Sequence, residues 1–190
     1  MEEFVLKAVD YAHSAHKGQF RKGTKIPYII HPLNVFETLH RLDFSLNIQI
    51  AGLFHDLIED TKITAEDITK DFNEEITGLV ISTSEKREAG VSEKKTWKQR
   101  KLHTIEFLSS NNNLGTIAIS ISDKLDNGKS LLLDKNIIGE KVWERFNAPY
   151  ENQKWYYSEL NRIFNEKSEM DTRIKFLSEE FNKVVLSVFS

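Results

Sequence analysis

The 190-residue chain contains no cysteine, so it forms no disulfide and offers no thiolate ligand to a metal. It also lacks a long apolar run. Its first residues, MEEFVLKAVDYAHSAHKG, are acidic at the start and amphipathic, which is typical of neither a signal peptide nor a membrane span. We therefore expect a cytoplasmic protein without a membrane partner.

An excess of charge of one sign is also missing. The chain has 26 Lys and Arg against 29 Asp and Glu, a formal net charge of −3, so no basic field points to a nucleic-acid partner. Charged residues make up 29% and hydrophobic residues 39%, a balance typical of soluble globular proteins. The length suffices for one domain with a substantial core.

The segment GLFHDLIEDT, residues 52–61, is the most informative part of the chain. Residues three and four apart share one face of a helix, so Glu59 and Asp60 would lie one turn beyond His55 and Asp56. Three carboxylates beside core-forming residues repel one another and are costly to desolvate unless a cation neutralises them. The alternative interpretation is an amphipathic helix whose polar stripe is solvated.

Two distant segments offer further ligands for such a cation. His31 precedes Pro32, which is favoured in the first turn of a helix, so we expect His31 at a helix entrance. Asp123 is followed by Lys124 and, four residues on, by Asn127. Taken alone, the histidine could be a cap or surface residue, and the aspartate could cap a helix or pair with a lysine. Two imidazoles and two carboxylates together suit a divalent ion of the Mn, Fe or Zn kind.

The order of a histidine, an adjacent His-Asp pair and a distant aspartate resembles the HD phosphohydrolase superfamily. More narrowly, HKGQFRKGTKIPYIIHPL, HDLIEDT and SDKLDNGKSL are similar to the hydrolase domain of RelA/SpoT-type alarmone enzymes, and the small alarmone (ppGpp) hydrolases are the most similar in architecture. The resemblance runs from about Ala12 to Leu160. It implies an all-α, HD-domain helical fold in a single domain, residues 1–165, with a C-terminal helix, residues 166–190, packed on it.

The resemblance also implies roles for individual residues. One divalent metal ion, usually Mn²⁺ with other transition metals possible, would be held by His31, His55, Asp56 and Asp123. Glu59 and Asp60 match the catalytic acidic pair of the family, and Arg21, Lys22 and Asn127 match substrate-contacting positions.

These roles agree with the chemistry of phosphate-ester hydrolysis. A metal can acidify its bound water and clamp a phosphoryl oxygen, and a carboxylate one helical turn away can take a proton from that water. Arg21, Lys22 and Lys124 could neutralise phosphate charge. The resemblance extends to the basic segment TWKQRKLHTIEFL, which could help to hold the phosphates of the substrate. The alternative interpretation of the RKGTK segment is an ordinary solvated loop. For TWKQRKLHTIEFL the alternative is a core anchor at Trp97 with its cations on a solvated face.

The expected activity is a Mn-dependent guanosine-3′,5′-bis(diphosphate) 3′-pyrophosphohydrolase, which releases GDP or GTP and pyrophosphate from ppGpp or pppGpp. The partner would be a small nucleotide, and a homodimer is possible. One alternative is a broader nucleotide or dinucleotide-cofactor phosphatase, and another is a nucleotide-sensing module of HD fold with little turnover. The third block departs from the family pattern at Lys124, Asp126 and Gly128, and the glycine removes a side chain that often lines the nucleoside pocket.

Local patterns predict most helices. We expect them over residues 2–16, 32–42, 46–58, 74–83 and 170–189, a short one after a Thr64–Asp67 capping box, one in TWKQRKLHTIEFL and one starting at Pro149. GTIAISIS alternates like a strand, but the resemblance implies a buried helix leading into Asp123. Residues 85–95 are charged and hold a glycine, so we expect a mobile loop there.

Overall fold

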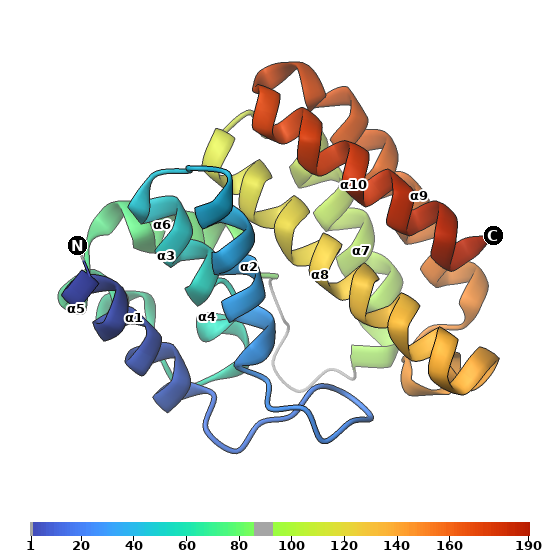
Figure 1. The fold of residues 1–190 in the computed structure, drawn as a ribbon, viewed down its shortest axis with the longest axis horizontal. Helices are drawn as coiled ribbons and strands as arrows, with labels where there is room; N and C mark the ends of the chain where they lie inside the picture. The colour runs from blue at the N-terminus through green and yellow to red at the C-terminus, as the bar shows by residue number, and fades with distance from the viewer. Residues whose placement is uncertain (1, 86–92) are drawn as a thin grey trace. The chain divides into compact units, whose positions relative to one another are not determined.

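The computed structural model describes residues 2–85 and 93–190, which form helices and, within these ranges, no strand beyond an isolated bridge between Phe20 and Pro27 (Figure 1). The all-α prediction is confirmed. Residues 86–92 of the expected loop lie outside the described residues, whereas residues 93–95 belong to a helix. The chain divides into two compact units, residues 1–84 and 85–190.

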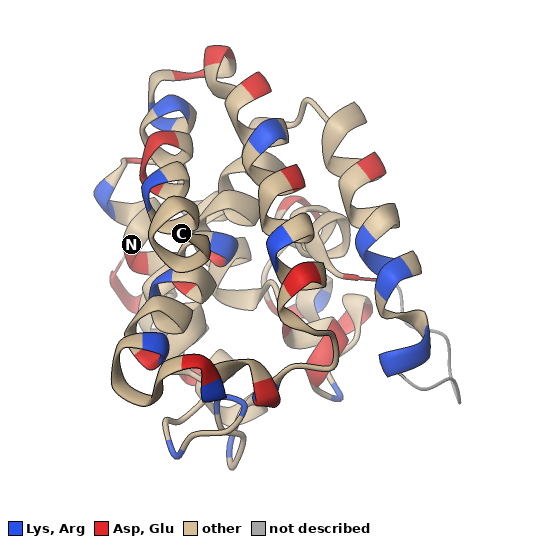
Figure 2. Cartoon of the chain, turned by 90° about the vertical axis from the view of Figure 1, so that its right-hand side faces the viewer, with Lys and Arg blue, Asp and Glu red and all other residues tan. Residues whose placement is uncertain are grey.

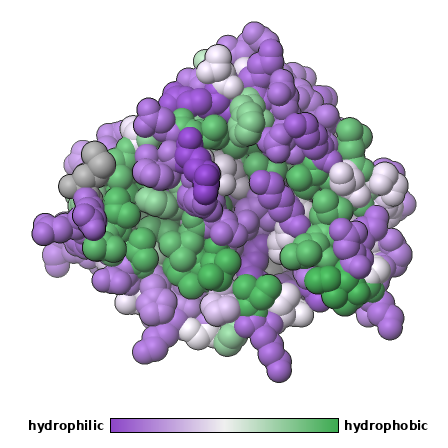
Figure 3. Space-filling model, viewed as in Figure 1, coloured by the Kyte–Doolittle hydropathy of each residue, from purple (hydrophilic) through white to green (hydrophobic). Residues whose placement is uncertain are grey.

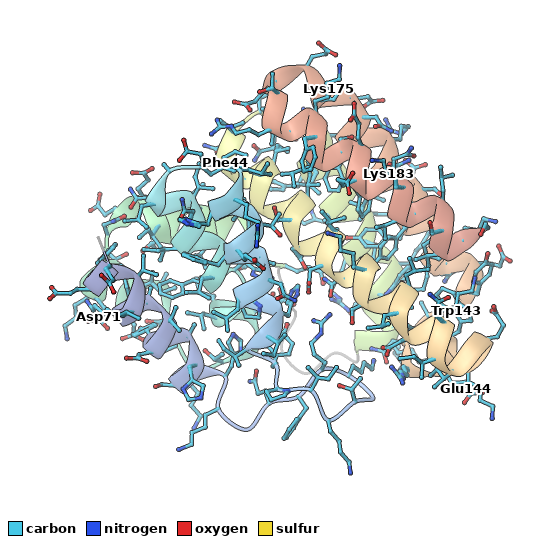
Figure 4. The ribbon with its side chains drawn as sticks, in the orientation of Figure 1. Phe44, Asp71, Trp143, Glu144, Lys175 and Lys183 are labelled. Atoms are coloured by element: carbon cyan, nitrogen blue, oxygen red, sulfur yellow. The ribbon has the colours of Figure 1, made fainter. Side chains whose placement is uncertain are left out.

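The described part of the first unit is built from helices around one core. The helix α3 packs against α1, α2 and α6, and α5 packs against α6. Phe44, which is 2% exposed and labelled in Figure 4, is among the largest side chains of this core. The helices are α1 (Glu2–Ala15), α2 (Ile30–Arg41), α3 (Leu46–Phe54), α4 (Leu57–Asp60), α5 (Ala65–Asp71) and α6 (Glu74–Thr83).

Side-chain caps start several of these helices. Ser45 accepts a hydrogen bond from the backbone of Ile48 at the start of α3, and Asn73 does the same at the start of α6. The predicted capping box between Thr64 and Asp67 is present at α5. Helix α2 starts at Ile30, two residues earlier than predicted, so His31 lies inside the first turn.

Close approach of α2 and α3 depends on Gly52. A Cβ atom on this residue would overlap Leu39 and would lie 3.2 Å from Cγ1 of Val35. The absence of a side chain therefore lets two helices, one carrying His31 and the other leading into His55, pack directly on each other.

In the second unit, α10 packs on α8 and α9, and α7 packs on α9. The expected placement of the C-terminal helix against other helices of the chain is thus observed, while the boundary at residues 165 and 166 stays a prediction. The elements are α7 (Glu93–Ser110), α8 (Leu114–Ile138), η1 (Gly139–Arg145), α9 (Tyr150–Glu166), η2 (Ser168–Met170) and α10 (Thr172–Phe189).

The alternating GTIAISIS segment is helical, as the resemblance implied. Asn113 caps the helix, and residues 115–122 are all buried. A helix that is buried on every side has no polar face, so its apolar residues do not recur with the helical period of 3.6 residues. Further along α8, a Cβ on Gly128 would lie only 2.7 Å from Cγ1 of Val184. Gly128 thus allows α8 and α10 to pack closely, whereas the sequence analysis had related this position only to the nucleoside pocket.

The last two helices start where predicted, within two residues. Pro149 is the N-cap of α9. Asp171 caps α10, and its hydrogen bonds from the Arg173 side chain and backbone hold the pKa of its carboxyl at about 2. Helical spacing predicts one buried apolar stripe on α10. Its members are buried except for Phe176, which is 50% exposed, so the inclusion of Phe176 was wrong; the predicted stripe comprised Phe176, Leu177, Phe181, Val184, Val185 and Val188. Trp143, labelled in Figure 4, stacks on Phe189 at the end of α10.

Charge and hydropathy are mixed on the surface. Figure 2 shows Lys and Arg interspersed with Asp and Glu along the helices that face the viewer. On the face shown in Figure 3, patches of hydrophobic residues lie among hydrophilic ones. Among the described residues, no helix combines the length and apolarity that crossing a membrane requires.

Candidate metal centre

The predicted helix over residues 46–58 is interrupted at the His-Asp pair. Helix α3 ends at Phe54 and α4 begins at Leu57, while Asp56 between them has φ −98° and ψ −2°. Adjacent residues of a regular helix do not face each other. At the interruption they do, because Nε2 of His55 lies 3.0 Å from Oδ2 of Asp56. The prediction of one continuous helix was wrong, and the break is what brings the pair together.

A second imidazole reaches the same carboxylate oxygen. Nε2 of His31 lies 3.7 Å from Oδ2 of Asp56, and one ring nitrogen of His31 lies within 4.8 Å of one of His55. The two rings meet edge to face with centroids 5.1 Å apart, and both residues are at most 3% exposed. Nδ1 of His55 donates to the carbonyl of Gly52 at 2.8 Å, which leaves Nε2 as the atom with a lone pair.

These three side chains fit a transition-metal ion. Ligand atoms about 2.1 Å from one ion can be no more than about 4.2 Å apart, and both nitrogen–oxygen distances are shorter than this limit. Two imidazoles and a carboxylate form the mixed donor set that suits Mn, Fe or Zn. The bond from His55 to a backbone carbonyl is the support that metal-bound histidines usually have.

Asp60 and Glu59 follow on α4, and both are partly buried. Tyr28 joins Asp60 to the centre, because its hydroxyl lies 2.5 Å from Oδ2 of Asp56 and 3.4 Å from Oδ2 of Asp60. Sequence reasoning did not assign a role to Tyr28. Tyr28 lies in the turn directly before α2, and no sequence pattern marks it as part of the site.

The basic segment predicted to contact substrate forms a small hairpin. Arg21 N–H donates to the carbonyl of Ile26, and Gly23 has a φ of +72° at the tip. The guanidinium of Arg21 lies 5.7 Å from the centre of the Tyr28 ring, whereas Lys22 is exposed. The hairpin therefore holds one cation on the tyrosine that contacts Asp56 and presents another to solvent.

The remaining predicted site residues cluster on α8 in the second unit. Both carboxylate oxygens of Asp123 accept bonds, one from Asn127 and the other from Nζ of Lys124 at 2.7 Å. Burial alone would lower the pKa of Lys124, but the Asp123 carboxylate outweighs burial and holds it well above its usual value. Lys124 is thus the ion-pair partner of Asp123, and its predicted contact with phosphate stays a prediction.

The basic helix α7 is held by an acid of its own unit. Glu85 accepts from Arg100, Lys101 and Thr104. Burial would raise the pKa of Glu85, but Lys101 and Arg100 outweigh burial and lower it. Trp97 is 7% exposed, which agrees with the interpretation of a core anchor.

Comparison with known proteins agrees with this arrangement. The sequence model of the HD domain matches residues 8–128. A Borreliella burgdorferi protein named guanosine-3′,5′-bis(diphosphate) 3′-pyrophosphohydrolase is 35% identical over 135 residues, which cover 70% of this chain and 20% of that protein. An Aquifex aeolicus protein of the same name is 32% identical over 186 residues, 96% of this chain and 25% of that protein.

Two solved structures are also similar. A crystal structure of a Listeria monocytogenes EGD-e protein has a TM-score of 0.71 and 35% identity, and the match covers 84% of this chain and 98% of that one. A structure described as a metazoan ortholog of SpoT that hydrolyzes ppGpp has a TM-score of 0.72 at 23% identity, which shows a shared fold. The chain spans about a quarter or less of the length of the curated relatives named above. The chain belongs to the HD domain family.

Proposed function

We propose that this protein is a metal-dependent phosphohydrolase that removes the 3′-pyrophosphate of guanosine tetra- or pentaphosphate, giving GDP or GTP and pyrophosphate. The observation that carries the proposal is the convergence of two buried imidazole nitrogens on one oxygen of Asp56. The printed names of the relatives from Borreliella and Aquifex support the choice of substrate.

In this proposal one ion, Mn²⁺ in the first instance, is held by His31, His55, Asp56 and Asp123. Bound there, it would acidify a water and neutralise charge at the scissile phosphate. Glu59 and Asp60, which lie on the short helix directly after the His-Asp pair, would orient that water and accept its proton. Arg21, Lys22, Lys124 and Asn127 would contact the substrate.

The decisive experiment is a hydrolysis assay with Mn²⁺ and guanosine tetraphosphate, with products separated by anion-exchange chromatography. The expected result is GDP with pyrophosphate, lost on chelation. Turnover of other nucleotides alone would favour the broader phosphatase, and nucleotide binding by the metal-loaded protein without turnover would favour the sensing module. A cytoplasmic location, a homodimer and the lack of nucleic-acid binding stay predictions.

The role of Glu59 is tested by Glu59→Gln, which removes the proton acceptor and keeps the size of the side chain. We expect kcat to fall by about 10²–10⁴-fold, the usual contribution of a general base, with metal content unchanged in elemental analysis. Glu66→Gln is the matched control, because Glu66 is an exposed acid of the first turn of α5. Undiminished turnover by Glu59→Gln would remove this residue from the mechanism.

A further inference from the structure

We propose that Tyr28 is a positioning residue, whose hydroxyl fixes the carboxylate of Asp56 toward the two imidazoles and thereby sets the metal affinity of the centre. The inference rests on the proposed function, because it concerns the same metal ion. It adds a residue of the loop before α2 to the ligands and acids of the site.

The hydroxyl of Tyr28 meets the one carboxylate oxygen on which the histidines converge. It lies 2.5 Å from Oδ2 of Asp56, the atom that is 3.0 Å from Nε2 of His55 and 3.7 Å from Nε2 of His31. A phenol has one proton to donate, and the shorter contact is the one to Asp56. The hydroxyl oxygen of Tyr28 is also 3.4 Å from Oδ2 of Asp60, so the hydroxyl lies between the carboxylates of Asp56 and Asp60.

The side chain of Asp56 is the part that such a bond can fix. Asp56 occupies the break between α3 and α4, and its backbone carbonyl accepts a hydrogen bond from the N–H of Asp60 at 2.8 Å, which fixes the backbone but not the side-chain torsions. The last torsion of an aspartate is broad, so its carboxylate can rotate among several orientations. A hydrogen bond to Oδ2 selects the orientation in which this oxygen faces both imidazoles.

Tyr28 is itself held in place from several directions. Its ring centre lies 4.9 Å from that of His16 and 5.9 Å from that of His31. Its backbone N–H donates to the carbonyl of Gln19 at 3.0 Å, which closes the base of the hairpin. The tyrosine is therefore fixed at both its backbone and its ring before any ion binds.

The same hairpin base also holds Asp60. Gln19 donates through Nε2 to the backbone carbonyl of Asp60 at 2.7 Å, and Nδ1 of His16 donates to Oε1 of Gln19 at the same distance. His16, only 2% exposed, therefore supports this base through Gln19 and the ring of Tyr28. Partners of this kind, which orient a ligand without touching the metal, typically account for 10–100-fold in metal affinity or activity.

The test is Mn²⁺ binding to metal-free Tyr28→Phe, measured by calorimetric titration without substrate. The substitution removes only the hydroxyl. We expect the dissociation constant to rise by about 10–100-fold while the number of sites per chain stays the same. Tyr11→Phe is the matched control, because Tyr11 is another partly buried tyrosine of the first unit and its ring contacts Phe54 and Phe72.

A dissociation constant equal to that of the unsubstituted protein would overturn the role of Tyr28. So would a fall in the number of sites at unchanged dissociation constant, which is the result expected if the hydroxyl only supports folding. Circular dichroism and urea unfolding of the metal-free variants measure any such loss of folded protein. If the unsubstituted protein binds no Mn²⁺, the proposed function fails first, so the two failures are distinguishable.

Discussion

Arg21 presents its charge in a defined place rather than at the end of a free side chain. Its guanidinium lies over the ring of Tyr28, and its backbone is tied into the hairpin. A guanidinium held in this way has lost part of its rotational freedom, so it can bind a phosphate or stack on a purine at a smaller entropic cost.

Removing this charge should weaken substrate binding more than it slows chemistry. A hydrogen bond to a charged group is worth about 1.5–3 kcal/mol, so Arg21→Ala should raise KM by about 10–100-fold and change kcat less. Steady-state kinetics with guanosine tetraphosphate measure both constants. Lys17→Ala is the control, as an exposed cation close by in sequence. An unchanged KM for Arg21→Ala would return the loop to the interpretation of a solvated surface.

Single residues of the site could be predicted only where a motif names them. The His-Asp pair and the distant Asp123 could be predicted as metal ligands because they stand in blocks that resemble a family. Tyr28 and Gln19 were missed, because a tyrosine near the end of a loop is compatible with many surroundings. What makes Tyr28 important is the direction of one O–H group, and no local pattern encodes that direction.

At the scale of helices, the two buried glycines at helix crossings have a common role. Gly52 lets α2 and α3 approach, and Gly128 does so for α8 and α10. In the interior of an exposed helix, alanine is more favourable than glycine by about 1 kcal/mol, because glycine loses more backbone entropy. Close packing reverses that preference wherever a methyl group would meet a neighbouring side chain.

Gly128→Ala should therefore destabilise the protein although alanine is the better helix former. The new Cβ would lie 2.7 Å from Cγ1 of Val184, and overpacking of this kind typically costs about 1–3 kcal/mol. The free energy of urea unfolding measures the effect. Gly78→Ala is the matched control, since no atom lies within 4 Å of the added methyl in α6, and it should stabilise by up to about 1 kcal/mol.

A second substitution shows whether the clash is the cause. Val184→Ala removes the facing methyl groups, so the double variant should be more stable than the sum of the two single effects predicts. Additive effects would mean that Gly128 is not constrained by Val184.

The helices themselves were largely predictable, because their signals are local. Caps at Thr64 and Pro149 and apolar periodicity in α1 and α10 gave starts and ends within two residues. The break at His55 was not predictable in this way. Residues 53–58 contain neither glycine nor proline, so no local signal marks the interruption.

At the scale of the whole molecule, the matched HD domain extends over both compact units, residues 1–84 and 85–190. Composition predicted only a globular chain of mixed charge. The described residues of each unit are folded into helices, which composition did not specify. Composition did not predict the division into two units. The charged segment that begins at residue 85 has the composition of an ordinary surface loop, so it does not mark a boundary.

Binding of the metal should stabilise the folded chain by linkage. An ion that binds only the folded protein contributes about 2.7 kcal/mol at a concentration of 100 times its dissociation constant. For a chain of this length that corresponds to a rise in Tm of roughly 5–10 °C. Differential scanning calorimetry with Mn²⁺, then with excess chelator, measures the shift and its reversal.

His55→Ala is the companion variant in that experiment, and its Tm should not respond to Mn²⁺. An equal rise in Tm for both proteins would show that the ion stabilises the chain at some other place.

The break between α3 and α4 also bears on design. Engineers who wish to copy this centre into another scaffold would naturally place His and Asp side by side on an ideal helix. Such a graft would point the two side chains in different directions, because neighbours on a regular helix diverge. The transferable part is instead the irregular turn formed by His55 and Asp56 together with the tyrosine that braces it. A scaffold chosen for its regularity would exclude the geometry it was meant to carry.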